Sequence, residues 1–246
     1  INSSSNYVGG ISGATTIEAN FYDILGIYFS SNTGDINCFG YCGGIDGYFT
    51  QGILLNSYNT GDINARWDNV GGIVGGELLS SLIANTYNTG DVYSSSTSNG
   101  RIAGLAAVSN GGTVYNSYNT GKITGESSGG LIGWQRATSC ITKNNFSIGE
   151  VWGTSYQAGL FGNSSISGDY NNNYWYNANT IDNATICNYG TVQGNCEVDS
   201  IDVFYSTTHD VYDTNEPHWD FGVDGNWQAC PSGLPILAWQ PTSDCA

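Results

Sequence analysis

Four acidic residues recur at one position of a repeated eight-residue pattern, and carboxylates placed in this way could bind a cation. The pattern reads NSYNTGDI at 56–63, NTYNTGDV at 85–92 and NSYNTGKI at 116–123, with looser copies at 29–36 and 144–151. The acidic column consists of Asp35, Asp62, Asp91 and Glu150. Such oxygen ligands suit Ca²⁺, but Lys122 interrupts the column. Solvated turn residues are the favoured interpretation, a weak Ca²⁺ site is the alternative, and no other cofactor is expected.

Sugar cleavage is the second chemistry to consider, because many parallel β-helices are polysaccharide lyases or glycosidases. Such sites need paired carboxylates, or a basic residue with acids, on one face. The arginines Arg66, Arg101 and Arg136 stand at different offsets from the glycines of their repeats, so they do not line up. We therefore expect no enzymatic activity, with a carbohydrate-active β-helix as the alternative.

Two further sets of side chains could bind ligands without any reaction. Tyrosines outside the repeated pattern could stack on sugars, since an aromatic ring offers a flat apolar face; they are Tyr41, Tyr48, Tyr156, Tyr205 and Tyr212. A threonine column could bind ice; its members are Thr33, Thr60, Thr89 and Thr120. Ice binding is the less favoured function, because these threonines flank a turn glycine and stand beside the acidic column.

The elements that position these residues follow from the repeat itself. Aligned on their glycines (Gly34, Gly61, Gly90, Gly121 and Gly149), the copies stand 27, 29, 31 and 28 residues apart. A Gly-rich block such as VGGIVG at 70–75 accompanies each copy. A period of this size indicates stacked repeats, and short apolar runs between Gly, Asn and Asp are typical of strands and turns. The sequence predicts an all-β chain, a parallel β-helix (β-solenoid) of about six coils over residues 1–176.

Stacking places equivalent residues above one another, so each repeated position becomes a row. We expect two apolar rows inside the coil: Ile36, Ile63, Val92, Ile123 and Val151, and Ile11, Ile45, Ile73, Leu105, Leu131 and Leu160. An aromatic row contains Tyr58, Tyr87, Tyr118 and Phe146, with Tyr174 as its continuation. Phe146 has no hydroxyl, so this position needs a ring rather than a phenol, which favours a core row over a sugar platform.

Asparagine occupies two positions of the repeat, and each position predicts a different structure. The first set is predicted to form a hydrogen-bonded amide ladder along the stack; it contains Asn56, Asn85, Asn116 and Asn144. The second set precedes Thr-Gly and is predicted to occupy turns with positive φ; it contains Asn59, Asn88 and Asn119.

The succession of GGIVG (71–75), NTYNTGDV (85–92) and AGL (103–105) resembles the GLUG repeat family. The resemblance covers about residues 8 to 176. It implies a β-solenoid in a secreted or surface-attached protein, similar to haemagglutinin-like adhesins and to arrays attached to secreted peptidases. The resemblance implies an adhesive role and carries no catalytic residues to this chain.

Residues 177–246 do not repeat and are predicted to form a disulfide-containing capping segment. The apolar end of the last coil needs a cover, and the segment offers Trp219, Trp227, Trp239, Leu234, Ile236 and Leu237. The first coil has no such segment, and its open face predicts docking on a neighbouring subunit, giving a head-to-tail filament. The alternative is an upstream segment that covers this face.

Composition limits the partners. The net charge of −16, with 5 basic residues, excludes binding to nucleic acid and to anionic membranes. No apolar run approaches the roughly 18 residues of a membrane span, so no insertion is expected. Self-association, other extracellular proteins and glycans are the expected partners.

Cysteines and glycan acceptors indicate an extracellular or cell-surface location. The expected disulfide candidates are Cys187 with Cys196, Cys230 with Cys245 and Cys38 with Cys42, which leaves one of seven cysteines free or joined to another chain. Candidate glycosylation sites are Asn2, Asn145, Asn163 and Asn183. The sequence thus predicts an extracellular, non-enzymatic structural or adhesive β-solenoid, with a carbohydrate-binding or carbohydrate-active protein as the alternative.

Overall fold

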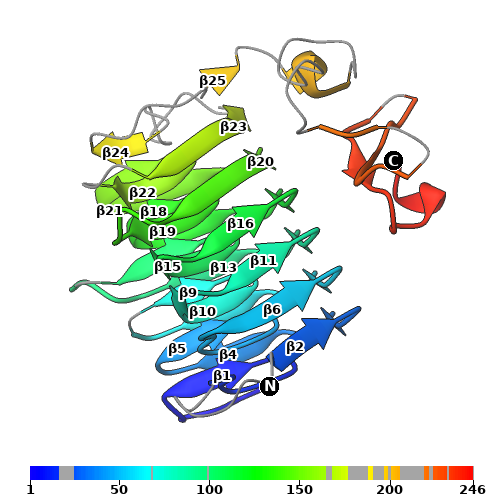
Figure 1. Ribbon diagram of the computed structural model, residues 1–246. Helices are drawn as coiled ribbons and strands as arrows, with labels where there is room; N and C mark the ends of the chain where they lie inside the picture. Colours follow the sequence, from blue (N-terminus) through cyan, green and yellow to red (C-terminus); the bar gives the residue numbers. More distant parts are fainter. Residues whose placement is uncertain are drawn as a thin grey trace.

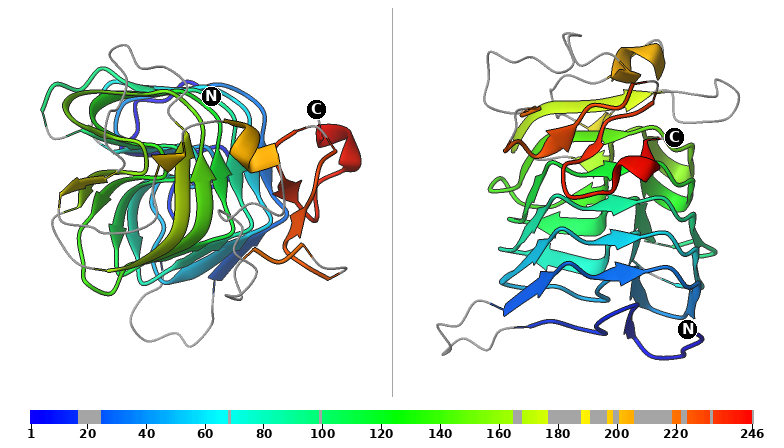
Figure 2. Two further views of the ribbon diagram at one scale, coloured as in Figure 1. Left: turned by 90° about the horizontal axis from the view of Figure 1, so that it is seen from above. Right: turned by 90° about the vertical axis from the view of Figure 1, so that its right-hand side faces the viewer.

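The chain winds into a β-solenoid of about five turns, which confirms the predicted all-β parallel β-helix (Figure 1). This is a computed structural model, and it describes residues 1–16, 25–67, 69–98, 100–164, 168–176, 188–190, 197–198, 201–205, 219–221, 224–231 and 233–245. Strands of successive coils lie side by side and form three stacked parallel sheets. Viewed along the axis, the coils superpose on one another (Figure 2).

The first sheet is nine-stranded, because one long strand, β18 (Ile123–Gly129), pairs with two strands of the coil before it and with one long strand of the coil after it. Its strands are β1 (Tyr7–Gly9), β4 (Ile36–Cys38), β5 (Tyr41–Gly43), β8 (Ile63–Ala65), β9 (Val70–Gly71), β13 (Val92–Ser94), β14 (Arg101–Ala103), β18 (Ile123–Gly129) and β21 (Val151–Ala158). The second sheet contains β10 (Val74–Leu79), β15 (Ala106–Asn110), β19 (Ile132–Gln135), β22 (Phe161–Ser164) and β24 (Asn188–Gly190).

The third sheet has eleven strands and carries the repeated Tyr-Asn pairs. Its strands are β2 (Leu25–Tyr28), β3 (Ser31–Asn32), β6 (Gly52–Leu55), β7 (Tyr58–Asn59), β11 (Leu82–Ala84), β12 (Tyr87–Asn88), β16 (Thr113–Tyr115), β17 (Tyr118–Asn119), β20 (Ile141–Ser147), β23 (Asp169–Tyr176) and β25 (Glu197–Val198). Near the C-terminus, β26 (Trp227–Gln228) and β27 (Ile236–Leu237) pair antiparallel, and η1 (Ile201–Tyr205) and η3 (Thr242–Asp244) are short 3₁₀ helices.

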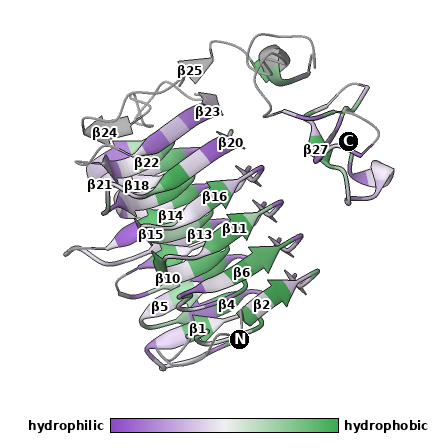
Figure 3. Cartoon of the chain, in the orientation of Figure 1, coloured by the Kyte–Doolittle hydropathy of each residue, from purple (hydrophilic) through white to green (hydrophobic). Residues whose placement is uncertain are grey.

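The core lies inside the coils because the short strands alternate between inward and outward side chains. In β4, for example, Ile36 and Cys38 are buried while Asn37 is exposed. Both predicted apolar rows are confirmed and belong to one buried cluster, except that Ile11 in the first coil is 50% exposed. Apolar segments recur at one place along successive strands such as β6 and β11 (Figure 3). Each coil therefore adds one layer to a continuous core, and its stability depends on its neighbours.

The described residues between 219 and 245 pack against the side of the solenoid rather than its end, so the three tryptophans do not form the predicted end cap. The Trp239 ring lies 6.0 Å from that of Tyr58 and 5.8 Å from that of Tyr87, which belong to early coils. The right-hand view of Figure 2 shows this segment against the strands of the third sheet. The physical reason is the aromatic row, which forms an apolar surface outside the coil that needs a cover.

The predicted boundary at residue 176 falls inside the stack. Strand β24 continues the second sheet beyond β22, and β25 continues the third sheet beyond β23. The parallel sheets therefore extend to Val198, although the sequence there no longer repeats.

Two of the expected disulfides join cysteines that lie close in the fold. Cys38 pairs with Cys42 and Cys230 with Cys245, with Cα atoms 6.4 and 5.2 Å apart. Cys140 is a buried free thiol. The expected pair Cys187–Cys196 lies outside the described residues.

Candidate functional site

The buried amide ladder is formed by the second set of asparagines, not the first, so the two predicted assignments are exchanged. Asn59 and Asn88 are fully buried. The Asn59 side-chain amide donates to Asn88 Oδ1 at 2.8 Å, and that of Asn88 donates to Asn119 Oδ1 at 2.9 Å. The other N–H of each amide donates to the carbonyl of the repeat glycine, such as Gly90 at 2.7 Å. Every polar atom of the ladder is thus bound within the scaffold.

The first set of asparagines forms the turns. Asn56, Asn85, Asn116 and Asn144 have φ angles of 51°, 52°, 46° and 58°. Asparagine is one of the few residues with a side chain that adopts this left-handed region readily. The physical reason for the exchange is the place of the turn, which comes just before the short Tyr-Asn strand. The asparagine in that strand, such as Asn88 in β12, therefore points into the coil.

The glycine block and the asparagine block are repeated together because they touch. A Cβ atom on Gly72 would lie 2.2 Å from the carbonyl oxygen of Gly104 and 2.4 Å from Asn88 Cγ. Gly44 stands in the same relation to Gly72 and Asn59. The second glycine of these two blocks is therefore required by the close approach of the amide ladder and of the next coil's backbone.

The aromatic row is a stack of parallel rings, as predicted. Centroids of Tyr58 and Tyr87 are 4.9 Å apart, those of Tyr87 and Tyr118 are 5.0 Å apart, and those of Tyr118 and Phe146 are 4.9 Å apart, with planes within 4°. Tyr174 continues the row in register with Phe146. These rings form a second apolar cluster with Phe204, Trp219, Trp227 and Leu237.

The C-terminal segment covers most of this row, although Tyr58, Tyr87 and Tyr118 also line a hollow of about 410 Å³. The Tyr118 hydroxyl donates to Gln240 Oε1 at 3.1 Å, and burial raises the pKa of Tyr118 above its usual range. Trp239 Nε1 donates to the Asn85 carbonyl at 3.1 Å and Trp227 Nε1 to Asn116 Oδ1 at 3.4 Å. The row is therefore mainly a packing feature between the coils and the C-terminal segment.

The acidic column bonds to the backbone of the next coil. The Asp62 backbone N–H donates to Asp35 Oδ1 at 3.1 Å, and the Asp91 N–H donates to Asp62 Oδ1 at 2.9 Å. Lys122, which interrupts the column, forms an ion pair with Glu150 at 3.0 Å. Among the described residues, no group of three or more His, Cys, Asp or Glu side chains is arranged to hold a metal ion. The Ca²⁺ alternative stays a prediction.

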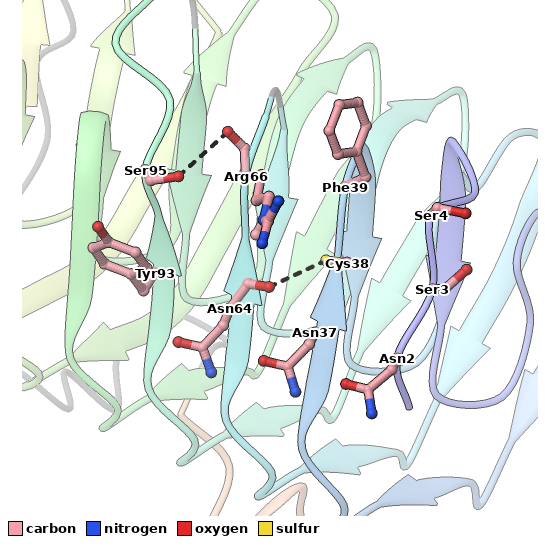
Figure 4. A pocket seen from close by; sticks show the side chains of 11 residues that line it. Asn2, Ser3, Ser4, Asn37, Cys38, Phe39, Asn64, Arg66, Tyr93 and Ser95 are labelled. Carbon is pink, nitrogen blue, oxygen red and sulfur yellow. Dashed lines mark hydrogen bonds between the residues drawn. The ribbon is translucent and has the colours of Figure 1, made fainter.

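A shallow groove lies on the outer face of the first sheet, and the sequence did not indicate it. Asn2, Asn37 and Asn64 lie side by side in register, with Tyr93 next to Asn64 (Figure 4). The groove has a volume of about 600 Å³, and Arg66, Phe39 and serines complete its lining. Phe39 stacks on Trp67 with ring centroids 5.9 Å apart, and these rings are 40% and 55% exposed.

A second hollow of about 380 Å³ continues the groove along the axis. Both hollows share Tyr93 and Ser95. The second is lined further on by Thr124 and Trp152, which are in register with Tyr93. One outward row thus runs along the first sheet, defined here as Asn2, Asn37, Asn64, Tyr93, Thr124 and Trp152 and called the outer row. Asparagine holds its first three positions, but Tyr93, Thr124 and Trp152 follow, so the row does not read as a repeat.

Other predicted surface residues are distributed over separate faces. Tyr41 and Tyr48 form a cluster with Tyr7, with ring centroids 5.3 to 6.0 Å apart. Tyr156 and Tyr205 are 38% and 39% exposed, and Tyr212 lies outside the described residues. Thr33, Thr60 and Thr89 line a hollow together with Gln240 and Asp244, so this column does not present a flat face.

The glycan acceptors differ in access. Asn2 is exposed and Asn163 is half-buried, while Asn183 lies outside the described residues. Asn145 is fully buried, and its amide donates to Asn173 Oδ1 at 2.8 Å and to the Lys143 carbonyl at 2.8 Å. The prediction for Asn145 is therefore wrong for the folded protein, which has no room for a glycan there.

One serine has the spacing of an esterase nucleophile. GESSG at 125–129 matches G-x-S-x-G, but Ser127 is buried within β18. A nucleophile of that class sits exposed on a sharp turn between strand and helix. The geometry does not support this role.

Comparison of the chain with protein-family models, curated proteins and solved structures gives no match. The resemblance to the GLUG repeat family stays a prediction. Over the part of the chain that the structure describes, no helix has the length and apolar character needed to cross a membrane.

Proposed function

We propose that this protein is a non-enzymatic β-solenoid that acts outside the cell as a structural and adhesive module. The buried rows are the chief support. Asn88 donates a hydrogen bond to its equivalent in the next coil, Asn119. Tyr118 stacks on its equivalent Tyr87 and donates a hydrogen bond to Gln240 of the C-terminal segment. The repeated side chains are therefore used by the scaffold, and the varied outward positions are left to contact partners.

The proposed location is supported by two disulfides, since such bonds persist in oxidising compartments. Secretion is tested by expression with a detectable tag in a host that forms disulfides. Thiol labelling after secretion would then modify none of the four cysteines Cys38, Cys42, Cys230 and Cys245 unless a reductant is added.

Self-association is part of the proposal, with a second copy of the chain as the partner. Six of the large apolar side chains that are exposed lie in the first 29 residues; they are Ile1, Tyr7, Ile11, Leu25, Tyr28 and Phe29. Exposed apolar side chains of this size favour the association of chains. Sedimentation velocity at rising concentration tests this, and a monomer at every concentration would remove the filament while leaving adhesion intact.

Adhesion is tested with the protein coupled to beads, which we expect to bind host-cell surfaces or extracellular matrix. Beads carrying the heat-denatured protein are the control. Equal retention of both would overturn the adhesive role. Release of reducing ends from glycans incubated with the protein would overturn its non-enzymatic character.

Carbohydrate binding is the second candidate function, and the outer row favours it. Amides and exposed aromatic rings together suit a ligand with hydroxyl groups and apolar ring faces.

A further inference from the structure

The outer row is a continuous line of side chains across five strands and the bridged residue Asn2. Isolated bridging joins Asn2 to Asn37, and strand pairing joins Asn37 to Asn64, Asn64 to Tyr93, Tyr93 to Thr124 and Thr124 to Trp152. Parallel strands lie about 4.8 Å apart, so the five steps extend for about 24 Å along the axis. A ligand that makes equivalent contacts at each step must itself be an extended chain.

The lining carries little charge although the protein is strongly acidic. No Asp or Glu lines either hollow, and Arg66 is the one charged residue among the lining residues of both. The chain as a whole has 21 acidic residues and a net charge of −16. An anionic polymer would approach against this net charge, whereas an uncharged polar chain would not.

The polar groups of the row are open to a ligand. Asn37 and Asn64 are exposed, unlike the buried Asn59 and Asn88 of the amide ladder. Each carboxamide offers two donors and an acceptor. Hydroxyl groups, which both donate and accept hydrogen bonds, can pair with these donors and this acceptor.

Aromatic rings stand farther along the same line. Tyr93 is 44% exposed. The Trp152 indole is held in place, because its Nε1 donates to Glu150 Oε2 at 3.1 Å and the Lys122 ammonium lies 5.1 Å from its ring centre. A fixed ring loses little conformational entropy when a ligand stacks on it.

We propose that the outer row binds one extended chain of a neutral polysaccharide, which lies along the solenoid axis. Its hydroxyl groups bond to the carboxamides of Asn37 and Asn64, and its ring faces stack on Tyr93 and Trp152. This inference rests on the proposed adhesive function and names the ligand class of that surface.

The test measures binding by isothermal titration calorimetry with soluble neutral polysaccharides (a glucan, a mannan, a galactan and a xylan) and with an anionic polyuronate. The protein is produced without N-glycans, because Asn2 begins the row and a glycan attached there would lie in the groove. We expect at least one neutral polymer to bind. Affinity should rise with oligosaccharide length until the chain reaches about 24 Å, the extent of the row.

Tyr93→Ala should weaken binding by about tenfold or more, as the loss of one aromatic hot spot does. Tyr205→Ala is the matched control, since Tyr205 is 39% exposed and lies on η1, outside the three parallel sheets. Both variants should keep the circular dichroism spectrum and melting temperature of the parent protein. Equal weakening by both variants, or none by Tyr93→Ala, would overturn the assignment of the site.

The experiments distinguish a wrong choice of ligand class from a wrong adhesive function. Beads that adhere to cells while no neutral polysaccharide binds in calorimetry would overturn this inference and leave the proposed function standing. Preferential binding of the polyuronate would overturn the choice of a neutral ligand. Beads that do not adhere at all would overturn the proposed function itself.

Discussion

The amide ladder predicts that one buried asparagine matters far more to stability than an exposed asparagine of the same repeats. Asn88 forms three side-chain bonds: its amide donates to the Gly90 carbonyl and to Asn119 Oδ1, and its oxygen accepts from Asn59. Alanine at this position removes all three. It leaves an Asn59 N–H and the Asn119 oxygen buried without these partners.

The expected loss of unfolding free energy is about 3–5 kcal/mol, from three bonds worth about 1 kcal/mol each and the desolvation of the groups left unpaired. Asn64→Ala is the control, because Asn64 belongs to the neighbouring coil but points outward into the groove. A surface change of this kind costs less than about 0.5 kcal/mol.

Urea unfolding followed by far-ultraviolet circular dichroism measures the difference. With a slope of about 2 kcal/mol per molar urea, Asn88→Ala should lower the midpoint by about 1.5–2.5 M. Asn64→Ala should leave the midpoint within about 0.3 M of the parent value by the same slope. Equal shifts for the two variants would refute the claim that Asn88, and not an outward asparagine, holds adjacent coils together.

Three other predictions follow from particular contacts. Gly72→Ala should destabilise the fold by about 1–3 kcal/mol or more through overpacking. Gly34→Ala should not, because the nearest atom to its added Cβ would lie 4.0 Å away. Thermal melts of both variants check this, and equal melting temperatures would contradict it. Tyr118→Phe should lower the unfolding free energy by about 0.5–1.5 kcal/mol, the value of one hydrogen bond. The loss stays small because Gln240 Oε1 keeps the bond from the Leu237 N–H and because Phe146 already occupies an equivalent position. A loss large enough to unfold the protein in a urea titration would contradict a core role for the ring. Burial raises the pKa of Asp46 above 3.8 even though Thr15 and the Tyr48 N–H donate to it. A raised native pKa favours folding most at pH below 3.8, and this advantage is lost as the pH rises through the native value. Asp46→Asn should therefore gain stability relative to the parent between acidic and neutral pH, and a difference in melting temperature that does not vary with pH would contradict this.

Periodicity predicted the fold because stacking makes equivalent residues neighbours. The glycine intervals and short apolar runs were sufficient to predict parallel coils, and the Tyr58, Tyr87 and Tyr118 stack followed from the same alignment. Periodicity alone could not assign the asparagines. Asn85 and Asn88 repeat equally well, and only the place of the turn decides which one points into the coil, since a shift along a strand exchanges its faces.

The C-terminal segment and the outer row were beyond the reach of the sequence for different reasons. Trp239 has no equivalent in the repeats, so nothing indicated that it would pack beside Tyr58 rather than over the last coil. The outer row does not read as a repeat because the asparagines Asn37 and Asn64 give way to Tyr93, Thr124 and Trp152 in the later coils. Positions that alternate with a buried row but vary between coils are the signal that could have found it.

The division between a scaffold of buried asparagines and a binding row of exposed ones can be tested most directly by NMR of the asparagine side-chain amides. The spectrum is recorded in H₂O with and without a neutral polysaccharide, and again after transfer to D₂O. The structure predicts that the signals of Asn59 and Asn88 persist in D₂O and do not move with ligand, whereas those of Asn37 and Asn64 exchange at once and shift when the polysaccharide is added. Rapid exchange at Asn88, or ligand shifts at Asn88 with none at Asn64, would contradict this account.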